Sequence, residues 1–254
     1  MTPQQPDRRN FIKKASLGSF LSLSLTEIVL SSFTEEKVSK IMLKKDDIIL
    51  FQGDSITDSG RLKTETGANQ SRLLGNGYPF MASSDLLMQH PTKNLKIYNK
   101  GISGNKVYQL AERWDTDCLE LKPNVLSIMI GVNDFWHTLT SNYTGTSDTY
   151  RKDYKALLER TKQSLPDVKL IIGEPFAVTG VKAVTEKWYP AFNEYRQAAK
   201  EMAASYNAAW IPYQTVFDNA QKLAPGSYWT TDGVHPTLAG ARLMATAWLE
   251  TVKG

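Results

Sequence analysis

Short apolar runs alternate with longer helix-like segments along most of this chain, and this alternation is the feature that most restricts its fold. The runs are rich in Ile, Leu and Val and cover residues 48–52, 95–99, 125–131 and 169–175, with a weaker fifth at 208–213. Helix-like segments lie between them, among them 105–121, 149–164 and 190–206. Strands of this kind, joined by helical crossovers, form a parallel sheet that helices cover on both faces. No internal repeat or low-complexity linker divides residues 41–254, so we predict one three-layer α/β/α domain over this range.

A last helix is predicted to follow the fifth run. Pro236 is expected at its first helical position, where a missing N–H does no harm. Apolar residues then recur at steps of three and four, which predicts one buried face. That face consists of Leu238, Ala241, Ala245, Trp248, Leu249 and Val252.

Residues 1–40 are predicted to be an export signal and a short linker. Arg8 and Arg9 precede Phe11, two lysines and an apolar, Ser-rich stretch, which is the layout of a signal peptide. The paired arginines resemble the signal of the bacterial twin-arginine (Tat) route, which predicts a periplasmic or secreted protein. The alternative is an amphipathic surface helix, and Glu27 does interrupt the apolar stretch. We expect no stable membrane span, because a spanning helix needs about 20 mostly apolar residues without charges.

Charge and residue counts exclude several classes of function. The net charge is +4, and residues 1–40 hold six basic and four acidic side chains, so the remainder carries only +2. This balance gives no support to nucleic-acid binding. A single cysteine, Cys118, excludes an intrachain disulfide and a cysteine metal cluster. Three histidines leave little room for a multi-histidine metal site, and we expect no metal or organic cofactor.

Small and polar residues follow the predicted strands. In parallel α/β sheets, ligands bind outside the carboxyl ends of the strands. "GDS" (53–55) follows the first run, "KGISGN" (100–105) the second and "GVNDFW" (131–136) the third, while "DGVHP" (232–236) stands before the last helix. The sequence therefore predicts a site built from these four segments.

These segments contain the parts of a serine hydrolase. The hydroxyl of Ser55 needs a base to take its proton, and the base works best when a third group orients it. His235 suits the role of base because imidazole titrates near neutral pH, and Asp232 is near enough to orient it. An oxyanion needs fixed donors, for which the Ser55 and Gly104 N–H groups and the Asn133 amide are candidates.

Each part also has an ordinary structural explanation. Gly-Asp-Ser can be a turn that caps a helix, and Gly104 can be a turn glycine. Asn133 can cap the segment after it, and Asp232 can cap the last helix, with His235 on the surface. The functional interpretation depends on their occurring together, in this order, each after a strand or before the last helix.

The four segments resemble the GDSL esterases, also called SGNH hydrolases. The blocks read "GDSITD" (53–58), "NKGISGN" (99–105), "GVND" (131–134) and "DGVH" (232–235), and the likeness extends over about residues 41–252. The resemblance implies a five-stranded parallel sheet in flavodoxin-like order, with Ser55 as nucleophile and Asp232 and His235 as acid and base. It also implies an oxyanion hole formed by Ser55, Gly104 and Asn133.

Within that family, the segments "FQGDSITDSGR", "RWDTDCLELKPN" and "VHPTLAG" are most similar to bacterial carbohydrate acetylesterases that act on xylan fragments. The resemblance implies hydrolysis of acetyl esters of oligosaccharides, with water as the final acceptor. Trp136, Tyr228 and Trp229 fall in predicted loops near the site, and flat rings suit stacking on sugars. The alternative is that these rings belong to the core, because large aromatic side chains usually bury their area.

Other functions use some of the same residues. A lysophospholipase or an acyl-thioesterase would have the same catalytic residues beside a long apolar groove. A metal-dependent hydrolase could use Asp54, Asp134, Asp232 and His235, although the histidine spacings of such enzymes are missing. A catalytically inactive carbohydrate-binding module is disfavoured, because every reactive position is filled. The acyl length, the sugar and the oligomeric state cannot be read from the sequence.

Overall fold

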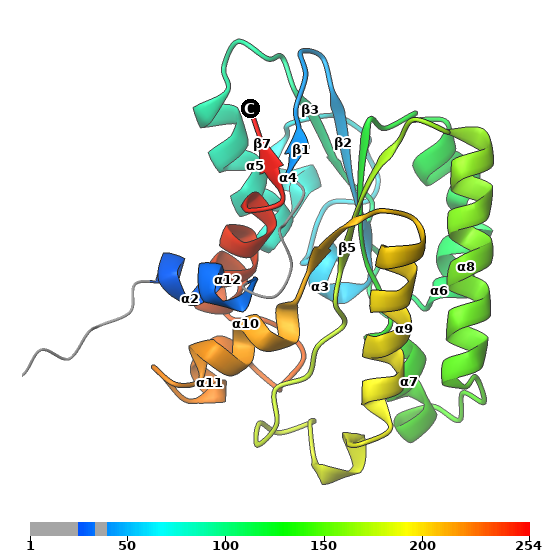
Figure 1. Ribbon diagram of the computed structural model, residues 1–254, viewed down its shortest axis with the longest axis vertical. Coiled ribbons are helices and arrows are strands. Elements are labelled where there is room, and N and C mark those ends of the chain that lie inside the picture. The colour runs from blue at the N-terminus through cyan, green and yellow to red at the C-terminus, as the bar shows by residue number, and fades with distance from the viewer. Residues whose placement is uncertain (1–24, 34–39) are drawn as a thin grey trace, which may run out of the picture.

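A five-stranded parallel sheet forms the centre of the protein, whose computed structural model describes residues 25–33 and 40–254 (Figure 1). The strands lie in the order β3-β2-β4-β5-β6, so β2, the first strand of this sheet along the chain, is second in the sheet. Leu50 of β2 pairs in register with Tyr98 of β3 and with Leu126 of β4. The predicted α/β/α class, the five strands and the flavodoxin-like order are confirmed. The strands are β2 (Ile48–Gly53), β3 (Lys96–Asn99), β4 (Val125–Met129), β5 (Lys169–Gly173) and β6 (Ala209–Ile211).

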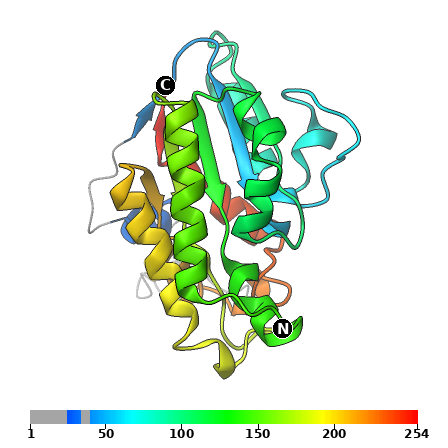
Figure 2. The same ribbon diagram turned by 90° about the vertical axis from the view of Figure 1, so that its right-hand side faces the viewer.

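Helices cover both faces of the sheet, which explains why its central strands are mostly apolar. Every residue of β4 is buried, as are Ile49, Leu50 and Phe51 of β2. One face carries α5 (Tyr78–Gln89), α10 (Tyr213–Ala220) and α12 (Leu238–Leu249). The other carries α6 (Val107–Glu112), α8 (Ser147–Ser164) and α9 (Phe192–Ser205), which lie in front of the sheet in Figure 2. Further helices are α3 (Ser55–Asp58), α4 (Ser71–Leu74), α7 (Val132–Thr140) and α11 (Gly226–Trp229).

The last helix begins two residues later than predicted. Its first helical residue is Leu238, and Pro236 lies outside the helix. Thr237 caps the helix, because its hydroxyl accepts a hydrogen bond from the Gly240 N–H at 3.2 Å. Ala241, Ala245 and Trp248 are buried as predicted. Leu238 is 76% exposed and is not part of the buried face, because it occupies the open first turn of the helix.

Helix α2 (Leu25–Ser32) lies before residue 41, the predicted start of the domain, and packs against the domain. Ile28 and Val29 are buried in the core, and Asn219 of α10 donates a hydrogen bond to the Ser32 hydroxyl at 3.0 Å. The apolar side chains of this segment therefore pack against the domain. The paired arginines Arg8 and Arg9 lie outside the described residues. Within residues 25–33 and 40–254, no helix combines the length and the apolar character that crossing a bilayer demands.

A small parallel pair, β1 (Ile41–Met42) and β7 (Val252–Lys253), was not predicted. Two-residue strands carry too short a pattern for periodicity to reveal. A π-helical turn (Asp115–Leu119) also interrupts the predicted helix 105–121 after α6.

Candidate active site

Ser55 lies at the point where β2 ends and α3 begins, at the carboxyl edge of the sheet. The Asp54 carboxylate caps α3 by accepting a hydrogen bond from the Ile56 N–H at 3.0 Å. Gly-Asp-Ser is therefore a turn with a helix cap, as the ordinary structural explanation supposed. Because Asp54 provides the cap, the hydroxyl of Ser55 is left for another partner.

That partner is His235, which is 180 residues away in the chain. The Ser55 Oγ lies 2.8 Å from His235 Nε2, and His235 Nδ1 lies 2.7 Å from Asp232 Oδ2. The other carboxylate oxygen, Asp232 Oδ1, accepts hydrogen bonds from the N–H groups of Val234 and His235 at 2.9 and 2.8 Å. The structure thus brings the three predicted residues into one hydrogen-bonded chain, and Asp232 caps its own loop rather than the last helix.

The ionisation state of Asp232 determines which atom donates in the hydrogen bonds between Asp232, His235 and Ser55. Partial burial raises the pKa of Asp232, but hydrogen bonds from the His235 N–H, the His235 ring and the Val234 N–H outweigh burial and hold it below its ordinary value. An ionised carboxylate can only accept, so His235 Nδ1 carries the ring proton. Nε2 is then an acceptor that faces the Ser55 hydroxyl, which is the arrangement that activates a serine.

The three candidate oxyanion donors come from three different segments. Ser55 opens α3, and the first N–H groups of a helix have no carbonyl partner within it. Asn133, in the first turn of α7, is buried and donates from Nδ2 to the Asn105 carbonyl at 3.2 Å. An amide NH₂ group has two hydrogens, so the second remains for a ligand.

Gly104 adopts a backbone conformation that favours glycine, with φ of +81°. A Cβ at this position would meet no atom within 4 Å. The space beside Gly104 is therefore open, and no other part of the protein that the structure describes approaches it there. Glycine at position 104 therefore suits the positive φ of the backbone, and a ligand can reach this position.

Asp54 and Asp134 are two buried carboxyl groups beside these residues. Burial raises the pKa of each to about 7. Hydrogen bonds from the Ile56 N–H to Asp54 and from the Val107 N–H to Asp134 Oδ1, at 3.2 Å, lower the pKa but do not outweigh burial. Each carboxyl has its Oδ2 buried with no hydrogen-bond partner in the protein. Asp134 thus caps α6 from α7. Among the described residues, no three His, Cys, Asp or Glu side chains are grouped to hold a metal ion, so the four residues of the metal-dependent alternative do not form such a site.

The three candidate sugar-stacking aromatics lie in different environments. The Trp136 ring is 6.0 Å from the His235 ring, centroid to centroid, so it borders the site. Tyr228 is 56% exposed and packs edge-on against Trp229. Trp229 is only 3% exposed, and its indole N–H donates to the Ala224 carbonyl at 3.1 Å. The prediction that the Trp229 ring stacks on a sugar is wrong, because the ring is buried and belongs to the core, as the alternative supposed.

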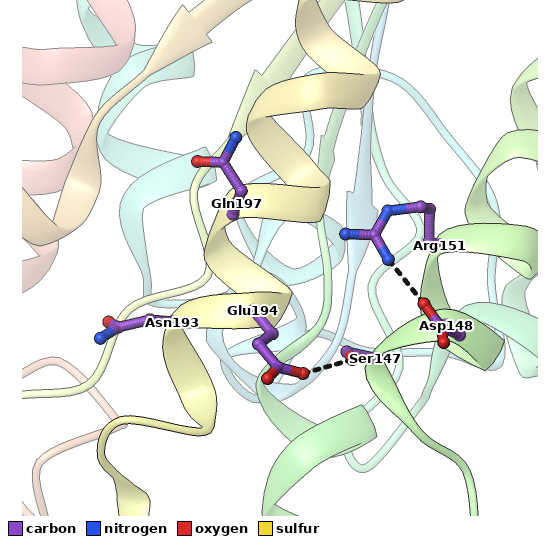
Figure 3. Close-up of a pocket in the computed structure, with 6 residues that line it drawn as sticks. All are labelled: Ser147, Asp148, Arg151, Asn193, Glu194 and Gln197. Atoms are coloured by element: carbon purple, nitrogen blue, oxygen red, sulfur yellow. Dashed lines mark hydrogen bonds and ion pairs between the residues drawn. The ribbon is translucent and has the colours of Figure 1, made fainter.

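A cavity of about 310 Å³ opens beside Ser55 and His235. Its polar lining includes Ser59, Asn76 and Thr237, and its apolar lining includes Ile56, Leu238 and Ala241. A second cavity, of about 480 Å³, lies between α8 and α9 (Figure 3). It contains none of the predicted site residues, and its Arg151 is already paired with Asp148 and Glu201. The smaller cavity is therefore the one that belongs to the site.

Comparisons with known proteins show which family the chain resembles. Residues 51–243 match the model of the GDSL-like lipase/acylhydrolase family. An acetylxylan esterase from Geobacillus stearothermophilus is 32% identical over 206 residues, which cover 80% of this chain and 93% of that protein. A protein named as a GDSL-like lipase from Parabacteroides merdae superposes with a TM-score of 0.82 at 51% identity, covering 84% and 98% of the two chains. A mutant acetyl-xylooligosaccharide esterase from Geobacillus superposes with a TM-score of 0.74 at 30% identity, covering 84% and 100%.

Proposed function

The chain belongs to the GDSL-like lipase/acylhydrolase family and is a carboxylic ester hydrolase, and we propose that it removes acetyl groups from carbohydrate through Ser55, His235 and Asp232. The observation that carries the catalytic part is the hydrogen-bonded chain Ser55–His235–Asp232, with contacts of 2.8 and 2.7 Å. The likeness to an acetylxylan esterase and to an acetyl-xylooligosaccharide esterase supports the carbohydrate part.

The first half of the reaction transfers the acyl group to the enzyme. The Ser55 Oγ attacks the ester carbonyl carbon while its proton passes to His235 Nε2. The carbonyl oxygen becomes negatively charged and is met by the N–H groups of Ser55 and Gly104 and by the Asn133 amide. When the intermediate collapses, His235 gives the proton to the departing alcohol oxygen. Asp232 remains ionised throughout and stabilises the positively charged imidazole.

Water completes the cycle. Once the alcohol has left, a water molecule takes its place beside His235, which removes one proton as the water oxygen attacks the acyl-serine. A second oxyanion forms in the same hole and collapses, returning the proton to Ser55 Oγ and releasing the carboxylic acid. This sequence uses no group beyond the chain's own residues and water.

The cavity near His235 supports a sugar as the leaving group. The departing oxygen must lie near His235 Nε2 to receive its proton, whereas the carbonyl oxygen lies toward Gly104 and Asn133. The cavity of about 310 Å³ is lined by Ser55 and His235 but by neither Gly104 nor Asn133. It therefore lies on the leaving-group side, and its mixture of Asn76, Thr237 and Leu238 suits a ring that bears hydroxyl groups.

A panel of esters tests this proposal against the lysophospholipase and thioesterase alternatives. Purified protein is assayed on acetylated xylo-oligosaccharides, on 4-nitrophenyl esters of acetate, butyrate and octanoate, on a lysophospholipid and on an acyl-thioester. We expect the largest kcat/KM on acetylated oligosaccharide and a fall as the acyl chain lengthens, with Ser55→Ala inactive on all of them. A preference for octanoate or lysophospholipid would replace the carbohydrate substrate by a lipid, and turnover by Ser55→Ala would remove Ser55 as nucleophile.

Export through the twin-arginine route is a further part of the proposal. Its support is the sequence pattern of Arg8 and Arg9, which precede the described residues, and of the apolar stretch after them. An exported esterase would meet soluble oligosaccharides outside the cytoplasm, which accords with the proposed substrate.

A further inference from the structure

The loop that carries Gly104 is fastened to the segment that carries Ser55. The Ile102 N–H donates to the Gly53 carbonyl at 3.1 Å, and Arg61 Nε donates to the Gly101 carbonyl at 2.7 Å. A Cβ on Gly101 would lie 2.5 Å from the Asp58 nitrogen, so only glycine lets the loop approach α3 this closely. These contacts make the nucleophile turn and the following loop one packed unit.

Asp58 contacts Ser103, the residue directly before Gly104. It is the last residue of α3 and is fully buried. One carboxylate oxygen, Asp58 Oδ2, accepts hydrogen bonds from the Ser103 N–H at 2.9 Å and the Ser103 hydroxyl at 2.6 Å. The same oxygen pairs with Lys63 Nζ at 2.8 Å. Ser103 is therefore held at two of its atoms by a side chain that comes from the nucleophile helix.

Holding Ser103 fixes the direction of the next N–H group. The Ser103 carbonyl and the Gly104 N–H belong to one planar peptide unit. With Ser103 fixed at its nitrogen and its side chain, the orientation of that unit depends on few remaining torsions. Gly104 itself adds no side-chain contact that could hold it, because the space where its Cβ would lie is open.

The charge of Asp58 is suited to this task. Burial raises the pKa of Asp58, but hydrogen bonds from Lys63 and Ser103 outweigh burial and keep it below its ordinary value. The carboxylate is thus ionised, and its bonds to Ser103 are of the stronger, charge-assisted kind. The ion pair with Lys63 offsets a negative charge that would otherwise oppose an oxyanion nearby.

We propose that Asp58 is a positioning residue of the oxyanion hole, which holds Ser103 so that the Gly104 N–H stays aligned with the Ser55 N–H. This inference rests on the proposed function, because it presumes that the oxyanion forms between these groups. It predicts that loosening Ser103 weakens binding of the transition state and leaves binding of the ground-state ester unchanged.

Two variants and a matched control test this role. Asp58→Asn weakens the acceptor while keeping its shape, and Ser103→Ala removes one hydroxyl without disturbing the backbone. Asp47→Asn is the control, because Asp47 is also a buried carboxylate that accepts a backbone N–H, from Lys44 at 2.7 Å, but it precedes β2 at the opposite edge of the sheet. The kinetic constants kcat and KM are measured on 4-nitrophenyl acetate. Thermal unfolding verifies that each variant is folded.

We expect Asp58→Asn and Ser103→Ala to lower kcat about tenfold with KM unchanged, since misplacing one donor costs less than the 10²–10³-fold of removing it. Asp47→Asn should stay within about twofold of the unmodified protein. Unchanged kcat in both Asp58→Asn and Ser103→Ala, with Asn133→Ala impaired, would overturn the positioning role alone. Full activity of Asn133→Ala, or no activity of the unmodified protein on any ester, would overturn the oxyanion hole and with it this inference.

Discussion

Replacing Asp134 by Asn is expected to stabilise the protein at alkaline pH and to do so less and less as the pH falls. Asp134 is buried and its Oδ2 has no hydrogen-bond partner in the protein, so ionisation inside the folded protein is unfavourable. Asn has the same shape and stays neutral at every pH. Its carbonyl oxygen can accept the hydrogen bond that the Val107 N–H donates to Asp134 at 3.2 Å.

The magnitude follows from the pKa of Asp134, which burial raises from 3.8 to about 7. Between these values the folded protein holds a proton that the unfolded chain has released, so stability falls as the pH rises through this window. The loss starts near pH 4 and is complete above pH 7, and a shift of about three pKa units corresponds to about 4 kcal/mol. About two of those units lie between pH 5 and pH 7, so the stability difference between Asp134→Asn and the unmodified protein should widen by about 3 kcal/mol from pH 5 to pH 8.5.

Urea unfolding at pH 5, 6, 7 and 8.5 measures this difference directly. Asp167→Asn is the control, because Asp167 is an exposed carboxylate after α8, and its curve should run parallel to that of the unmodified protein. The comparison rests on the change with pH, so a constant cost of the substitution does not affect it. A stability difference that stays flat from pH 5 to pH 8.5 would refute the reasoning, since it would mean that Asp134 titrates alike in the folded and unfolded chains.

Four other substitutions test separate parts of the structure. Ser55→Ala should abolish ester turnover and leave thermal unfolding unchanged, and retained turnover would place the nucleophile elsewhere. Asn133→Ala should lower kcat by roughly 10²–10³ on 4-nitrophenyl acetate, whereas an effect on KM alone would make Asn133 a ground-state contact. Trp229→Ala should cost about 3–5 kcal/mol of unfolding free energy; a selective loss of sugar hydrolysis at full stability would return Trp229 to the substrate site. Lys at both Arg8 and Arg9 should leave precursor in the cytoplasm on cell fractionation, and normal delivery would exclude the twin-arginine route.

The central strands β2, β4 and β5 could be predicted because they are buried on both faces and therefore read as apolar runs. The same rule fails for β1 and β7, which are two residues long, and for α2, whose buried Ile28 and Val29 stand in a stretch that also resembles a signal peptide. Local patterns reveal elements of sufficient length, but they do not reveal which surface a short apolar segment will cover.

The site shows a similar division. The segments that hold Ser55 and Asn133 could be located because the carboxyl edge of a parallel sheet gathers the ends of its strands. The segment that holds His235 could be located by its place before the last helix and by the family resemblance. The roles of neighbouring aromatics could not be separated, since Tyr228 and Trp229 are adjacent in the sequence yet only one is exposed. Asp58 was also missed, although it stands three residues after Ser55, because its role depends on a contact with Ser103, 45 residues away.

The distance along the chain between the proposed nucleophile and its proposed base has a consequence during synthesis. All five strands of the sheet lie before residue 212, whereas Asp232 and His235 come after them and reach back to Ser55 across 180 residues. While a ribosome is still making the chain, the sheet and the turn that holds Ser55 can form with no base beside the hydroxyl. In the proposed mechanism, a nascent chain in this state would not hydrolyse esters. Hydrolysis would start only when the segment that contains His235 docks, so the onset of esterase activity would mark the end of folding.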